Sequence, residues 1–246
     1  RSGQRSLGER MHMLGGRTAS LSHLYAKAYP CPVEPSILSP MRSLRSVIIS
    51  LSLLSITALN AQVLMPIGNE FRVNQVTANE QTLPHVASEA DGSYVIVWRS
   101  WNQEGSGGSV WARRYGADHV AITPEFQVAT GLGSSDRPYV YRWSEGRYVV
   151  VWLQASTTRM RVLLADNTLG DEYTLAIGLD FDIDIRGDEL LAAYTSDQHI
   201  RLRKWDLIAN AWVANAEQAS EAPSLNYQLP QVRWTSTGNI VAVYRG

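Results

Sequence analysis

The sequence has a single cysteine, Cys31, among its 246 residues. One thiol cannot close an internal disulfide, so a disulfide framework is excluded. Stability must therefore come from buried apolar surface. The eight tryptophans, all of which follow Ala61, are the largest side chains available for that burial.

An excess of basic residues is also lacking, since the formal net charge is −1. Residues 1–61 carry seven of the 22 basic and two of the 23 acidic residues, which leaves 15 basic and 21 acidic residues beyond Ala61. Nucleic acids and anionic membranes both require a clustered basic face. We therefore expect neither as a partner.

Local catalytic motifs are missing as well. The histidines at 85, 119 and 199 stand alone, without the paired spacing that would place two imidazoles on one metal ion. The sequence has no Gly-x-Ser-x-Gly elbow and no phosphate-binding Gly-x-x-x-x-Gly-Lys, and the segment Gly105–Gly108 is typical of a hairpin loop. No catalytic or cofactor-binding residue is predicted, and the chain is expected not to be an enzyme.

A long apolar run is lacking too, because the longest, Val47 to Leu59, is shorter than the about 20 residues of a membrane span. The basic residues Arg42 and Arg45 precede it, and the small residue Ala61 follows. Residues 41–61 are therefore predicted to be a signal peptide, with an uncleaved anchor as the alternative. We expect a protein that is secreted or at the cell surface, without membrane insertion after cleavage.

Residues 1–40 precede this export signal and show no periodicity. They are interpreted as an upstream segment that is non-native, translated in error from Arg1 to Pro40, or else a genuine disordered leader.

What the sequence does contain is a repeat. Similar units start near residues 70, 125, 172 and 217, at intervals of 55, 47 and 45 residues. A second landmark is an apolar run that ends in an aromatic residue, and these ends are 54, 42 and 50 residues apart: Tyr94–Trp98, Tyr148–Trp152, Leu190–Tyr194 and Ile240–Tyr244. Two landmarks that recur together indicate copies of one supersecondary unit.

Each unit is predicted to consist of strands. The runs Val95–Val97 and Val149–Val151 are continuous and β-branched, as in strands covered on both faces, and a Gly-containing turn precedes each. Four strands in about 50 residues are typical of a propeller blade. We therefore expect residues 62–246 to form an all-β, incomplete β-propeller of about three four-stranded blades and the start of a fourth. Separate sandwich domains, the alternative, would bury too little surface.

The first unit resembles the repeat of secreted bacterial surface proteins with β-propeller-like repeats. That resemblance implies an extracellular scaffold and transfers no catalytic residue. It is most specific in the first unit and rests on these segments: Phe71–Asn74, Gln81–Ala87, Asp91–Trp98, Gln103–Gly107 and Trp111–Tyr115.

One acidic segment is a candidate metal site. Its carboxylates, Asp180, Asp182, Asp184 and Asp188, have a spacing that could converge on Ca²⁺. Ile183 and Ile185 alternate with them, however, which favours a plain strand with one buried face. The adjacent Arg186-Gly187-Asp188 spells an adhesive tripeptide but coincides with an expected hairpin turn.

Two classes of function remain open. The first is a non-catalytic secreted scaffold that binds an unknown glycan or protein ligand for adhesion at the cell surface. The alternative is a propeller-type glycoside hydrolase of the sialidase kind, whose catalytic residues lie in a part of the protein missing from this sequence. A propeller that only spaces another domain is a third possibility.

Overall fold

The computed structural model describes residues 25–28, 67–105, 107–129, 135–177, 180–213, 215–220 and 228–245. They divide into two compact units, Tyr25–Arg72 and the residues from Val73 onward. Strands and turns make up all of the described structure, which contains no helix. A helix capable of crossing a membrane is accordingly not found among these residues.

The smaller unit is an antiparallel pair of strands, β1 (Tyr25–Ala28) and β2 (Ile67–Arg72), in which Tyr25 faces Arg72. β1 lies within the segment 1–40, whose interpretation as a non-native or disordered segment stays a prediction. The predicted signal peptide, residues 41–61, lies outside the described residues.

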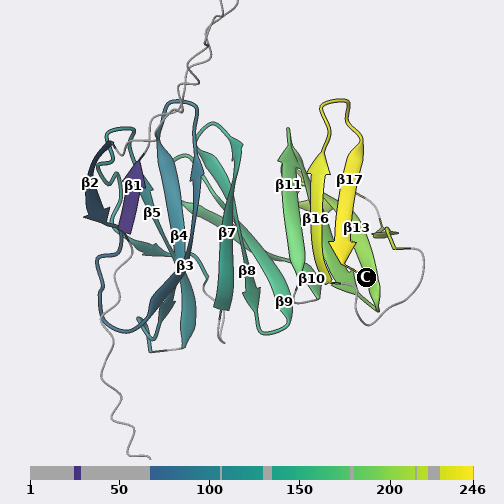
Figure 1. Ribbon diagram of the computed structural model, residues 1–246, viewed down its shortest axis with the longest axis horizontal. Helices are drawn as coiled ribbons and strands as arrows, with labels where there is room; N and C mark the ends of the chain where they lie inside the picture. Colours follow the sequence, from purple (N-terminus) through teal and green to yellow (C-terminus); the bar gives the residue numbers. More distant parts are fainter. Residues whose placement is uncertain are drawn as a thin grey trace, which may run out of the picture. The chain divides into compact units, whose positions relative to one another are not determined.

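The larger unit contains four antiparallel sheets, each built mainly from consecutive strands (Figure 1). In the third sheet, both β14 (Ala211–Trp212) and β15 (Glu217–Gln218) pair with β13 (His199–Asp206). The first sheet is β3 (Gln81–Ser88), β4 (Tyr94–Trp101), β5 (Gly108–Tyr115) and β6 (Phe126–Gln127), and the second is β7 (Ser135–Ser144), β8 (Arg147–Gln154), β9 (Thr157–Leu163) and β10 (Leu169–Ile177). The third is β11 (Phe181–Arg186), β12 (Glu189–Ser196), β13 (His199–Asp206), β14 (Ala211–Trp212) and β15 (Glu217–Gln218), and the fourth is β16 (Gln228–Trp234) and β17 (Ile240–Arg245).

These sheets confirm the all-β class and the four-stranded unit. A closed propeller is not present in the described residues, so the propeller itself stays a prediction. The unit-opening segments of the sequence repeat lie in the outer strands of the preceding sheets: Phe126 in β6, Tyr173 in β10 and Glu217 in β15. The sequence repeat is therefore offset by one strand from the sheets, because a sequence shows that a strand recurs but not which strand it pairs with.

The second strand of each complete sheet is the core, as the sequence predicted. In β8, Val150 and Trp152 pack against the first sheet, while Val149 and Val151 pack against the third. All four side chains are fully buried. A strand covered on both faces needs apolar residues at every position, which explains the continuous run.

Glycine permits the hairpin turn that precedes each of these strands. Gly146, between β7 and β8, has φ +66°, and a Cβ added there would lie 3.0 Å from the Cβ of Ala165. Gly187, between β11 and β12, has φ +58°, but no heavy atom lies within 4 Å of its added Cβ. The two turns thus share the left-handed conformation and differ in the space around it.

Replacing Gly146 by alanine should lower the free energy of unfolding by about 1–3 kcal/mol. The alanine would be strained in the left-handed backbone conformation, and its Cβ would also lie too close to Ala165. Gly187→Ala is the matched control and should cost only the strain, about 1 kcal/mol. Urea unfolding of both variants measures the difference. Equal losses would show that the contact with Ala165 has no energetic weight.

Candidate functional site

The candidate site is built on the first strand of each sheet. The strands β3, β7, β11 and β16 are edge strands of their sheets, and β7 contacts both β3 and β11, while β11 also contacts β16. An edge strand has backbone N–H groups that its own sheet cannot pair. These N–H groups therefore depend on hydrogen-bond acceptors of the neighbouring sheet.

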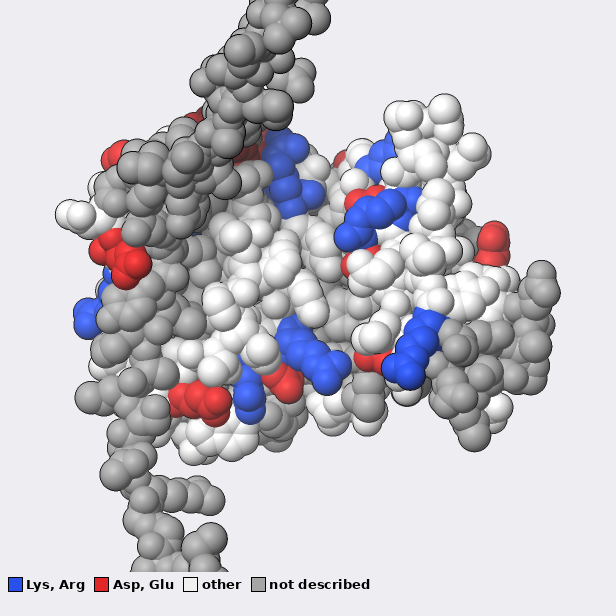
Figure 2. Space-filling view, viewed as in Figure 1, with Lys and Arg blue, Asp and Glu red and all other residues white. Residues whose placement is uncertain are grey.

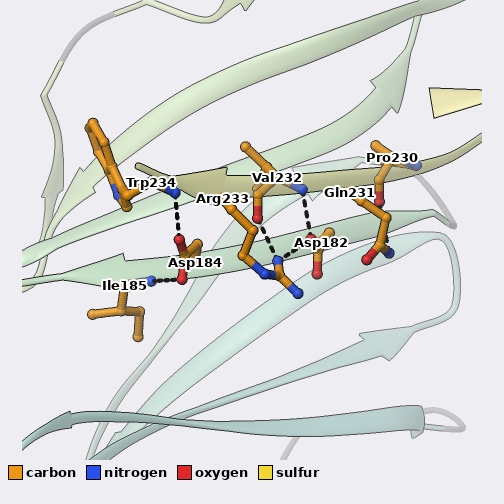
Figure 3. Close-up of polar contacts among 8 residues, drawn as sticks. All are labelled: Asp182, Asp184, Ile185, Pro230, Gln231, Val232, Arg233 and Trp234. Atoms are coloured by element: carbon orange, nitrogen blue, oxygen red, sulfur yellow. Dashed lines mark hydrogen bonds and ion pairs between the residues drawn. The ribbon is translucent and has the colours of Figure 1, made fainter. Parts of the chain in front are cut away.

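Side chains of one sheet accept hydrogen bonds from the edge of the next. His85 Nδ1 accepts the N–H of Val140 at 3.2 Å. Asp182 Oδ2 accepts the N–H of Val232 at 2.7 Å, and Asp184 Oδ2 accepts that of Trp234 at 2.6 Å (Figure 3).

The carboxylate of Asp182 has a second, charged partner. Arg233 Nη1 donates to Asp182 Oδ2 at 2.6 Å (Figure 3), and Asp182 is buried whereas the Arg233 side chain is 59% exposed. Close by, burial raises the pKa of the Tyr141 phenol, and the negative charge of Asp182 adds to this effect. Tyr141 consequently remains a neutral hydroxyl beside Asp182 and Arg233.

The four candidate calcium ligands have separate partners. Asp182 and Asp184 bind the backbone of β16, Asp188 Oδ1 accepts the indole N–H of Trp143 at 3.1 Å, and Asp180 Oδ1 lies 3.9 Å from Arg137 Nη1. No three metal-binding side chains come together anywhere in the described ranges. Pairing with β12 keeps Phe181–Arg186 extended, which is the plain strand that the sequence favours for this segment, and the calcium site stays a prediction.

A repeated bulge near the start of the first strands was missed from the sequence. Leu83, Arg137 and Leu229 each precede a proline, have φ of +53°, +48° and +53°, and lie where the pairing register shifts. Non-glycine residues in this conformation are strained, and such residues cluster at ligand sites. The recurring X-Pro pairs were the available signal.

Asp180 occupies the matching position of the third sheet. In each sheet, the residue two positions further on pairs with the residue just before the aromatic end of the apolar run. These four residues are His85, Tyr139, Asp182 and Gln231. The four sheets thus present leucine, arginine, aspartate and leucine at one repeat position. Only the two middle sheets carry charge there.

A small pocket of about 120 Å³ opens at this row. Its walls are Arg137 and Tyr139 of β7, Phe181 at the start of β11 with Asp180 just before it, and part of β16 from Leu229 to Gln231. The rings of Tyr139 and Phe181 meet edge to face with centroids 5.5 Å apart. The pocket therefore combines fixed aromatic surface with a base and an acid, which suits a ligand that has an apolar face and hydroxyl groups.

The molecular surface shows no broad field of one sign on the face drawn in Figure 2. Basic and acidic side chains lie there in small neighbouring groups. Polar selectivity at the small pocket depends on individual pairs such as Arg137 with Asp180.

Comparisons with known proteins show likeness of structure alone. No known protein family and no curated protein matches the sequence. Among solved structures, it is similar to an exo-beta-1,3-galactanase from Phanerochaete chrysosporium with beta-1,3-galactotriose, at 11% identity and a TM-score of 0.45, over 70% of this chain and 45% of that one. It is also similar to an alpha-L-arabinofuranosidase from Lactobacillus brevis, at 11% identity and a TM-score of 0.40, over 74% of this chain and 70% of that one. A third is from a study of two prolyl endopeptidases, at 13% identity and a TM-score of 0.41, over 72% of this chain and 25% of that one.

These neighbours are enzymes, and this finding corrects the expectation that the chain is not one. The expectation rested on missing local motifs, but strand ends from separate sheets can assemble a site without any local motif. Identities of 11–13% and TM-scores below 0.5 carry no argument for a particular activity. The chain spans less than half the length of the galactanase.

The contact between His85 and Val140 should make stability depend on pH. Burial lowers the pKa of the His85 imidazole below 6.5, so the folded protein holds the neutral ring that accepts the Val140 N–H. The unfolded chain binds more protons as the pH falls below 6.5 toward the lower folded pKa, so the free energy of unfolding should decrease over that range.

Urea unfolding between pH 7.5 and 5 tests this assignment. His85→Gln retains an acceptor but does not titrate, and should remove part of the decrease. His119→Asn, whose asparagine tolerates the left-handed φ of 64° there, is the control and should retain it. A decrease of the same size in His85→Gln and in the wild type would contradict the role of His85.

Proposed function

We propose that this chain is part of a propeller-type glycoside hydrolase and that the pocket between β7, β11 and β16 contacts the saccharide. The observation that carries the proposal is the divergence of one repeat position to Arg137 and Asp180, which lie 3.9 Å apart beside two aromatic rings. The resemblance of the repeat to secreted surface proteins and the export signal predicted at 41–61 add, within this proposal, an extracellular location.

The pocket has the groups that a sugar ring requires. A pyranose offers C–H groups on its faces, which pack on aromatic rings such as those of Tyr139 and Phe181, and hydroxyls around its edge. The Asp180 carboxylate, with a 27% exposed side chain, accepts hydrogen bonds from hydroxyls, and the 52% exposed Arg137 donates them.

Glycoside hydrolysis needs two carboxyl groups about 5–9.5 Å apart on either side of the scissile bond. Asp180 is the carboxylate that lines this pocket. Asp182 already binds Val232 and Arg233, so its role in the proposal is to hold β16 and Arg233 in place. Asp180 therefore contacts substrate, and Asp182 is a positioning residue.

Asp180→Asn should lower kcat/KM for the cleaved glycan by about 10- to 100-fold, the effect of losing a hydrogen bond to a charged group. Reducing-sugar release from a panel of plant, fungal and bacterial polysaccharides measures it. Asp197→Asn, in the exposed β12–β13 turn, is the control and should leave the rate unchanged. Absence of hydrolysis across the panel, or an Asp180→Asn variant with full activity, would overturn the proposal.

A further inference from the structure

A second cavity lies between the second and third sheets and has a volume of about 310 Å³. Its lining comes from the β7–β8 hairpin, from β9 and β10, and from the turn that follows β13. This volume is at the lower end of the about 300–1,000 Å³ typical of small-molecule sites. We call it the lateral pocket; none of its lining residues belongs to the pocket at Arg137 and Asp180.

Aromatic side chains held by their neighbours form one wall of the lateral pocket. The indole N–H of Trp143 donates to Asp188 Oδ1 at 3.1 Å, and the guanidinium of Arg147 lies 5.4 Å from the Trp143 ring centroid. Tyr173 packs against Trp205, with centroids 5.1 Å apart. The rings are thus fixed before any ligand arrives, which lowers the entropy cost of binding.

The turn after β13 supplies the facing wall. Asp206 Oδ1 accepts the N–H groups of Ile208 and Ala209, both at 2.8 Å, and the Leu207 N–H donates to the carbonyl of Asp188 at 2.9 Å. Ile208 is 61% exposed at this wall. Asp188 therefore positions both walls, through its carboxylate on Trp143 and its carbonyl on Leu207.

The rim of the lateral pocket carries polar groups whose charges balance. Asp171 of β10 and Asn210, which has φ +52°, are exposed, and Arg147 is the only cationic residue of the lining. One acid, one base and one amide surround an aromatic and aliphatic floor. A phosphate or an acidic ligand would need more positive charge, and a lipid chain would need a longer apolar cavity.

We propose that the lateral pocket binds a neutral sugar residue. The ring face packs on the Trp143 and Tyr173 wall and on Ile208, and the hydroxyls bond to Asp171, Asn210 and Arg147. This site does not depend on hydrolysis at Asp180, since it lies on other strands and turns.

Two variants test the lateral pocket from different sides. Gly170 lines it, and an added Cβ would make only ordinary contacts, 3.6 Å from the Val162 carbonyl and 3.7 Å from the Val162 Cβ. Gly170→Val therefore narrows the pocket with a residue that suits a strand. Asn210→Gly removes the amide and keeps the left-handed backbone, and Asn79→Gly, at φ +61°, is the matched control.

The probes are maltose, cellobiose and lactose, with affinity measured by ligand-observed NMR and tryptophan fluorescence. We expect at least one to bind the wild type with a Kd on the order of 1 mM. Gly170→Val should weaken it at least about tenfold, Asn210→Gly about two- to tenfold, and Asn79→Gly not at all.

Three results would overturn the lateral site. The first is no binding of any probe at roughly ten times the expected Kd. The second is equal weakening by Asn79→Gly and Asn210→Gly. The third is binding that Asp180→Asn abolishes and Gly170→Val leaves intact, since that places the sugar in the pocket at Arg137. Binding that survives in Asp180→Asn supports the lateral site even if hydrolysis is never found.

Discussion

The N–H groups that each first strand cannot pair within its own sheet constrain how the neighbouring sheets pack. A buried N–H without a partner costs about 1–3 kcal/mol, so every such group needs an acceptor from outside its own sheet. Asp182 meets this need for Val232, and Asp184 meets it for Trp234. Because acceptors must recur at alternate positions, the side chains between them turn to the opposite side, where Ile183 is buried in the core. In β11 one hydrogen-bonding requirement thus accounts for both the carboxylates that bind β16 and the isoleucine that is buried in the core.

The same residues connect the core to the candidate ligand surfaces. Asp188, in the turn after β11, anchors Trp143 by its carboxylate and Leu207 by its carbonyl, so it joins the second sheet to the turn after β13. Asp182 joins β11 to β16 and holds Arg233 at the surface. Both carboxylates were candidate calcium ligands in the sequence. Their contacts show that regularly spaced acidic residues can accept hydrogen bonds from a neighbouring sheet as readily as they can bind a cation.

The sequence predicts the parts of the fold that local pattern determines. The continuous β-branched run at Val149–Val151 marks a strand buried on both faces, and Gly146 marks the turn before it, because each property acts within a few residues. The sheet to which a strand belongs was harder to predict from the sequence. Phe126 lies in the last strand of the first sheet, although its motif marks the start of a sequence unit. The pocket at Arg137, Asp180 and Leu229 could not be predicted, because its walls come from three strands that only tertiary packing brings together.

The residues that recur in every unit and the residues proposed to bind ligand therefore occupy different positions in this chain. The positions that recur with one chemistry, such as the second strands and their turns, are those that packing and backbone geometry dictate. The position before the bulge proline is restricted in its backbone but not in its side chain, which is exposed at Leu83 and Leu229. Where a repeat leaves a side chain free, a change to Arg137 or Asp180 costs little stability and alters only what the surface can bind. Searching for motifs shared by all units consequently finds the scaffold, whereas the residues proposed to bind ligand, Arg137 and Asp180, stand where equivalent positions differ.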